Sequence, residues 1–167
     1  LKGKANLVTK ADVASQKAIL SLITKNFPDH DYLAEENGVK NTGSDYVWVI
    51  DPIDGTTNFA HTFPQSGVSI ALFYKGEPVL GGVTNPATGE TFLAQKGKGA
   101  TLNGKKIHVS QTPKLEQSLL VTGFPYNRFT RMPVLLKRFE KFLNSCHDVR
   151  RLGSAALDLC WLAAGRT

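Results

Sequence analysis

The stretch "WVIDPIDGTTNF", Trp48 to Phe59, is the most informative part of the sequence. Apolar residues that favour strands lead directly into Asp51, so a buried strand fixes the position of that carboxylate. A second carboxylate, Asp54, follows three residues later, and Gly55 comes next. A plain turn needs one Asp or Asn and a glycine, and the second carboxylate therefore indicates a site rather than a turn alone.

The composition is that of a globular domain. The 167 residues are 41% hydrophobic and 20% charged, which is enough for one domain with a core. No apolar run approaches the ~20 residues that a membrane helix needs. The opening "LKGKANLVTK" lacks the apolar segment of a signal peptide. Two distant cysteines, Cys146 and Cys160, do not make a disulfide framework, so we expect a reducing compartment. With no signal peptide and no membrane helix in the sequence, we expect a cytoplasmic location and no membrane contact.

Charge is unevenly distributed along the chain. Residues 1–95 hold seven lysines against ten acidic residues, whereas residues 96–151 hold twelve Lys and Arg against three acidic residues. A basic segment suits a solvated surface, an anionic small substrate or a nucleic acid. Aromatic residues do not alternate with the basic ones as a base-stacking surface requires. We therefore expect no nucleic-acid partner.

The first two thirds of the sequence predict one helix and several antiparallel strands, an α+β arrangement. The helix covers residues 10–28, with Val13, Ile19, Leu20, Leu22, Ile23 and Phe27 on one face and Pro28 at its end. Residues 31–38 are expected to form a loop. Strands are predicted at 45–51, twice within 66–86 around Lys75-Gly76, and twice within 90–110 around Asn103-Gly104.

After about residue 115 the pattern changes to strand–helix–strand–helix, typical of a βαβ layer. The predicted elements are a strand at 118–124, a helix at 132–146, a strand at 148–152 and a helix at 154–165. We expect an N-terminal α+β layer over residues 1–115 and the start of an α/β layer over 116–167. Two strands and two helices are few for such a layer, so we expect the sequence to be cut short.

Four acidic positions, Asp12, Glu35, Asp51 and Asp54, lie where predicted elements give way to loops. Gathered carboxylates repel one another unless a cation neutralises them, and hard oxygen ligands suit Mg²⁺ or Ca²⁺. The four histidines are dispersed, which argues against zinc. Backbone N–H groups after Gly55 favour an anion beside such a metal. Metal ligands next to a phosphate-binding turn indicate a metal-assisted phosphate-ester hydrolase; the alternative is that the two aspartates only cap a turn or a helix.

These residues resemble the signature of the inositol monophosphatase family of Mg²⁺-dependent, lithium-sensitive phosphatases. In that signature an acidic pair in a loop precedes a strand leading to Asp-Pro-Ile-Asp-Gly-Thr, and here the two parts are "LAEENG" and "WVIDPIDGTTNF". The similarity continues through "FPQSGVSIAL", "GGVTNPATGETFLAQKGKGATLNGKKIHVS" and "RRLGSAALDLCWLAAG", and so covers nearly the whole chain. It implies a layered αβαβα sandwich of the sugar-phosphatase type, with the C-terminal α/β half incomplete.

The resemblance also implies a role for each matching position. It implies a first metal held by Glu35, Asp51 and the carbonyl of Ile53, and a second held by Asp51 and Asp54. The implied catalytic residues are Asp12, Thr56 and Glu35, with Asp12 and Thr56 orienting the attacking water. The implied substrate contacts are Glu35, Ile53, Asp54, Gly55, Thr56, Gly153, Ser154 and Ala155.

The family carries a later Trp-Asp motif, whose aspartate completes the second metal site, and a substrate-binding glutamate before it. The sequence ends before both, so we expect a complete first metal site and a second site that lacks one ligand. The resemblance implies hydrolysis of an inositol monophosphate, a small-molecule partner and a homodimer. The alternatives are fructose-1,6-bisphosphatase or histidinol-phosphatase activity, or a truncated, non-catalytic or RNA-associated regulatory member.

Overall fold

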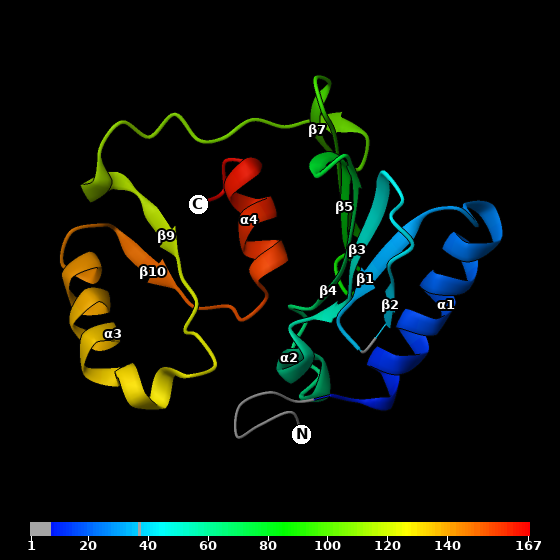
Figure 1. The fold of residues 1–167 in the computed structure, drawn as a ribbon. Coiled ribbons are helices and arrows are strands. Elements are labelled where there is room, and N and C mark those ends of the chain that lie inside the picture. Colours follow the sequence, from blue (N-terminus) through cyan, green and yellow to red (C-terminus); the bar gives the residue numbers. More distant parts are fainter. Residues whose placement is uncertain (1–7, 37) are drawn as a thin grey trace.

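The computed structural model describes residues 8–36 and 38–167, so the expected absence of a signal peptide, which concerns the first residues, lies partly outside the described range. Five layers follow one another across the molecule: helix α1, a large sheet, helix α4, a small sheet and helix α3 (Figure 1). The predicted αβαβα layering is confirmed. None of the helices in the described ranges is long and apolar enough to cross a membrane.

The element bounds differ in part from the prediction: residues 90–110 form three strands rather than two, and the helix expected at 132–146 spans Arg128–Leu143. The bounds are α1 Lys10–Asn26, β1 Asp31–Ala34, β2 Gly38–Lys40, β3 Tyr46–Asp54, α2 Thr56–Ala60, β4 Gly67–Tyr74, β5 Glu77–Asn85, β6 Glu90–Gln95, β7 Gly99–Leu102, β8 Lys105–Lys106, a 3₁₀ turn Leu115–Gln117, β9 Leu119–Val121, α3 Arg128–Leu143, β10 Asp148–Arg150 and α4 Ala155–Ala163. The predicted hairpins after β4 and β7 are confirmed. Their turn residues have the positive φ angles of tight primed turns, 50° and 81° at Lys75-Gly76 and 47° and 79° at Asn103-Gly104.

The large sheet has the strand order β2-β1-β3-β4-β5-β6-β7-β8, and β9 pairs with β10 in parallel in the small sheet. The loop expected at residues 31–38 was wrong, because strands β1 and β2 form there. The purely antiparallel expectation was also wrong at one place, since β1 and β3 run parallel. After β1 the chain reverses direction and forms β2 along one edge of β1. It then reverses again and forms β3 along the other edge, so β1 and β3 run in the same direction.

Strand β3 continues beyond its predicted end at Asp51, through Pro52 to Asp54, with a register shift against β4 between Asp51 and Asp54. A bulge of this kind tolerates a proline, which has no N–H for the ladder. The strand is less buried than expected: Ile50 is buried, whereas Val49 is partly exposed. The bulge matters for the site, because it lies between Asp51 and Asp54, two of the predicted metal ligands.

Two apolar clusters hold the large sheet between its helices. On one side Ile23 of α1 packs with Ala34 and Ile50, and on the other Leu157 and Trp161 of α4 pack with Phe92. The single apolar face predicted for α1 was wrong in part, because Val13 and Leu22 are exposed. Helix α1 is an outer layer and only one side of it meets the sheet (Figure 1). The division into two domains stays a prediction.

Candidate functional site

The bulge in β3 presents two carboxylates near the carboxyl end of the strand. The Asp51 carboxylate accepts a hydrogen bond from the N–H of Ile53, at 3.1 Å. The Asp54 carboxylate is turned toward α4, where its Oδ2 accepts from the hydroxyl of Ser154 and the N–H of Ala156, both at 2.6 Å. These short bonds fix the direction of the carboxylate.

Asp12 reaches the same place from the first turn of α1, where it is 2% exposed. Its Oδ2 belongs to the capping box of that helix and accepts from the N–H and hydroxyl of Thr9. Its Oδ1 accepts from the Thr56 hydroxyl at 3.1 Å, and that hydroxyl also lies 3.0 Å from the carbonyl oxygen of Ile53. One carboxylate therefore both caps α1 and orients Thr56.

Glu35 lies in the turn after β1, where its N–H donates to the carbonyl of Ile50 at 3.1 Å. This bond ties the turn to β3, and the Glu35 side chain lies close to Asp51. Burial, and after it the charges of Glu35 and Asp54, raise the pKa of Asp51 to about 7. The contributions of Glu35 and Asp54, which come after burial, reflect negative charge close to Asp51, a condition that a bound cation relieves.

Gly55 begins α2 in the left-handed conformation, with φ of 86°. A side chain at this position would meet the Gln65 carbonyl at 2.8 Å and the Gly153 carbonyl at 3.2 Å. The backbone of the turn therefore lies directly against the segment from Gly153 to Ala155. Ser154 caps α4 by accepting from the N–H of Leu157 at 3.4 Å, and it is almost fully buried.

A cleft of about 730 Å³ opens beside these residues. One wall carries Asp54, Gly55 and Thr56 with the segment from Gly153 to Ala155, and the other is the chain from Val121 to Arg128. The structure thus brings together every site residue predicted from the sequence: Asp12, Ile53 and Asp54 bond directly to Thr56 or Ser154, and Glu35 lies beside Asp51.

Sequence reasoning missed Asp158, which lines the cleft from α4 and is 9% exposed. Burial, and after it the charge of Asp54, raise its pKa to about 6, while Arg151 opposes the shift. Its Oδ1 has no hydrogen-bond partner among the described residues. No local pattern distinguishes this acid from a surface aspartate on a helix, because only the packing of α4 against the cleft buries it.

Within residues 8–36 and 38–167, no three Asp, Glu, His or Cys side chains form a ready-made metal cage. The donors near Asp51 are the Glu35 carboxylate and backbone oxygens such as that of Ile53. Mg²⁺ commonly binds one or two carboxylates and completes its shell with water and substrate oxygens. An oxygen-only donor set with surplus negative charge therefore fits Mg²⁺ without a full protein cage.

Comparison with known proteins agrees with this geometry. The model of the "Inositol monophosphatase family" matches residues 1–167. The chain belongs to the inositol monophosphatase family. It is 45% identical over 171 residues to "Phosphatase IMPL1, chloroplastic" of Arabidopsis thaliana, covering 98% of the chain and 46% of that protein. It is 43% identical to "Nus factor SuhB" of Pasteurella multocida, covering 99% of the chain and 62% of that relative.

Solved structures of the family superpose closely on the chain. The suhB protein of Bartonella henselae gives a TM-score of 0.95 at 38% identity, over 100% of the chain and 65% of that structure. Inositol monophosphatase from Anabaena gives 0.90 at 45% identity, over 96% and 64%. The chain spans between about half and two thirds of the length of the curated relatives it matches. Its place in the family and its fold are therefore established for the part that is present.

Proposed function

We propose that this member of the inositol monophosphatase family takes part in Mg²⁺-dependent hydrolysis of a sugar-alcohol phosphate, with inositol monophosphate as the first candidate. The observation that carries the proposal is the hydrogen-bonded unit in which Asp12 and the Ile53 carbonyl hold the Thr56 hydroxyl, beside the carboxylates of Glu35 and Asp51. Residues from α1, β3 and α2 converge there although up to 44 positions separate them in sequence.

In this proposal Glu35, Asp51 and the Ile53 carbonyl hold one Mg²⁺, and Asp51 with Asp54 contributes to a second. When bound, Mg²⁺ lowers the pKa of a coordinated water and neutralises charge on the phosphoryl oxygens. Asp54 already accepts two hydrogen bonds on Oδ2, which leaves Oδ1 as its metal-facing oxygen. Ser154 and the Ala156 N–H thereby orient that ligand.

Thr56 has one hydroxyl proton and two oxygen acceptors near it. With its proton directed to Asp12, the Thr56 hydroxyl can accept a hydrogen bond from the attacking water. As the water gives its proton to Thr56, Thr56 passes its own proton to the Asp12 carboxylate, which is the base of the pair. The buried capping box prevents Asp12 from rotating away. The N–H groups of Gly55 and Thr56, at the start of α2, hold the phosphate, because first-turn N–H groups lack partners within a helix. Gly153, Ser154 and Ala155 contact the rest of the substrate.

The substrate assignment rests on the relatives. "Inositol-1-monophosphatase" of Caulobacter vibrioides is 41% identical over 168 residues, and that of Synechocystis is 46% identical. Fructose-1,6-bisphosphatase and histidinol-phosphatase activity stay the alternatives for the substrate. A homodimer and a cytoplasmic location also stay predictions.

A regulatory function is the second candidate, because several relatives are named Nus factor. Helix α3 carries five basic residues, Arg128, Arg131, Lys137, Arg138 and Lys141. A surface of this charge suits an acidic partner. Binding to RNA that weakens with salt, and weakens further when these residues are replaced, would support this candidate.

The test is phosphate release from inositol 1-phosphate by the purified protein, with Mg²⁺ and with or without Li⁺. We expect turnover that needs Mg²⁺ and that Li⁺ suppresses. Asp54→Asn should lower the rate by about 10²–10³-fold, the scale of one lost electrostatic stabiliser, without unfolding the protein. Asp45→Asn, which changes an exposed acid paired with Lys75, is the matched control and should leave the rate unchanged. Full activity of Asp54→Asn would refute the metal assignment.

A further inference from the structure

The geometry points to Asn58 as a positioning residue that sets the distance between the phosphate-binding turn at Gly55 and the opposite backbone segment at Gly153. This inference rests on the proposed function, because it assigns the two segments to one substrate. Asn58 belongs to the stretch from Trp48 to Phe59, but neither the residue pattern nor the family resemblance predicted a role for it.

Asn58 lies in α2 and its side-chain nitrogen makes two hydrogen bonds. Nδ2 donates to the carbonyl of Gln65 and to the carbonyl of Leu152, each at 2.7 Å. Leu152 is 94 positions away in the sequence. A carboxamide has only two N–H groups, so both are used to tie α2 to two other segments at once.

The two glycines allow this close approach. A side chain at Gly153, where φ is 91°, would lie 3.1 Å from Nδ2 and 3.3 Å from Oδ1 of Asn58. A side chain at Gly55 would lie 3.2 Å from the Gly153 carbonyl. The two backbone segments therefore approach closely at two glycines. The side chains of Asn58 and Arg151 lie against Gly153, and the two bonds of Asn58 set the spacing of the segments.

The bonds of Asn58 also affect the position of Asp54. The Leu152 carbonyl that Asn58 holds comes just before Gly153, and the next residue, Ser154, donates to Asp54. Leu152 also packs against the apolar cluster beneath α4. A shift of the Gly153 segment would therefore move both the substrate wall and the group that orients Asp54. Misplacement by ~1 Å can cost about 10²-fold in rate.

The test compares wild-type protein with Asn58→Asp and Asn58→Ala in the presence of Mg²⁺. Asn58→Asp has the same shape but places an oxygen against two carbonyls, and Asn58→Ala removes both bonds without adding charge. We expect both variants to raise the Kd for inorganic phosphate about tenfold and to lower kcat/KM by about 10²-fold. A purely structural role would lower the melting temperature and leave the Kd of the folded protein unchanged.

Asn85→Asp is the matched control. Asn85 is fully buried, and its Nδ2 donates to the carbonyl of Pro64, next to the carbonyl that Asn58 holds, at 3.2 Å. This variant should lower stability but keep the wild-type Kd for phosphate. Weaker phosphate binding in Asn58→Asp alone would mean charge repulsion and would overturn the inference.

The readouts separate this inference from the proposed function. If the wild-type protein binds phosphate but releases none from inositol 1-phosphate, the proposed activity fails while the Kd comparison still decides the role of Asn58. If the wild type is active and Asn58→Ala binds phosphate normally, the inference fails alone. Absence of both binding and turnover in the wild type would overturn both.

Discussion

The two sides of the cleft differ in how firmly they are built. The large sheet is packed on one face by α1 and on the other by α4, and both buried apolar clusters belong to it. By contrast, none of the described residues from 111 to 150, which include the small sheet and α3, is buried. Figure 1 shows α3 as an outer layer that covers only β9 and β10.

This difference places the candidate chemistry on the well-packed side. Asp12, Asp51, Asp54 and Thr56 extend from elements that touch the large sheet, whereas the chain from Val121 to Arg128 supplies the opposite wall from the thinly packed side. Groups that orient a metal and a water need fixed positions. The thinly packed wall has fewer buried contacts to hold its shape and can adjust more than the well-packed one.

The largest expected difference comes from matched leucines on the two sides. Leu157→Ala removes a fully buried side chain of α4 and should lower the free energy of unfolding by about 2–5 kcal/mol. Leu136→Ala removes a side chain of α3 that is 51% exposed and should change it by no more than about 0.5 kcal/mol. Urea denaturation measures both, and equal losses would contradict the comparison.

A smaller effect should appear in the pH dependence of stability. The pKa of Asp158 is raised to about 6 in the folded protein, so the folded state binds more protons than the unfolded state between about pH 4 and 6. Stability due to this group is present at low pH and is lost as the pH rises through about 6. Between pH 7 and pH 5 the free energy of unfolding should rise by about 1 kcal/mol more in the wild type than in Asp158→Asn.

Thermal or urea unfolding of both proteins, without metal, at several pH values measures this difference. Comparison of the two proteins cancels the contribution of Asp51, which is present in each. Parallel pH profiles would show that the packing of α4 does not perturb Asp158.

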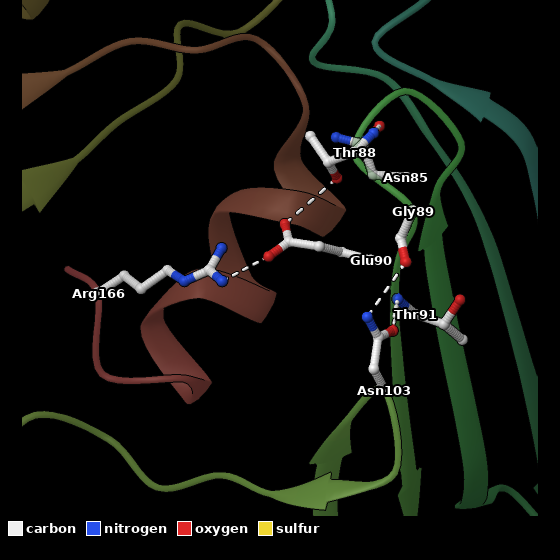
Figure 2. Close-up of polar contacts among 7 residues, drawn as sticks. All are labelled: Asn85, Thr88, Gly89, Glu90, Thr91, Asn103 and Arg166. Carbon is white, nitrogen blue, oxygen red and sulfur yellow. Dashed lines mark hydrogen bonds and ion pairs between the residues drawn. The ribbon is translucent and has the colours of Figure 1, made fainter.

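The smallest effect concerns the far end of α4. Arg166 pairs with Glu90, and the Thr88 hydroxyl also donates to Glu90, so this ion pair ties the segment after α4 to the turn between β5 and β6 (Figure 2). In the same view Asn103 accepts from the N–H of Thr91 and donates to the Gly89 carbonyl. Glu90 is only 17% exposed in this pair, so it is screened less than a surface pair.

Arg166→Ala should lower the free energy of unfolding by about 0.5–1 kcal/mol, and the loss should shrink in high salt. Lys96→Ala is the matched control, because the pair of Lys96 with Glu77 is more than half exposed on both sides. Its removal should cost less than Arg166→Ala at low salt. If Lys96→Ala lowered the free energy of unfolding as much as Arg166→Ala or more, the Arg166 pair would not anchor α4.

The sequence predicted the elements whose pattern is local. The turns at Lys75-Gly76 and Asn103-Gly104 follow from residues that tolerate positive φ. The helices α1 and α4 follow from their apolar periodicity. The prediction from sequence failed at β1 and β2, because a segment that begins with Asp31 and leads into an acidic turn has the pattern of a loop. Asp31 is buried there with its carboxylate accepting from the N–H groups of residues 42–44, a pairing that no local pattern reveals.

By itself, the sequence predicted the carboxylate-rich stretch from Asp51 to Asp54, since this depends on residue types at short spacing. The family followed from the resemblance of that stretch, and the five-layer order was implied by the resemblance. Only the tertiary structure decided which partners those residues have. The bonds of Asp54 with Ser154 and of Asn58 with Leu152 join positions 100 and 94 residues apart. Such contacts form when α4 packs on the large sheet and buries Leu157. Contacts between residues so far apart in the chain produce no periodic pattern in the sequence.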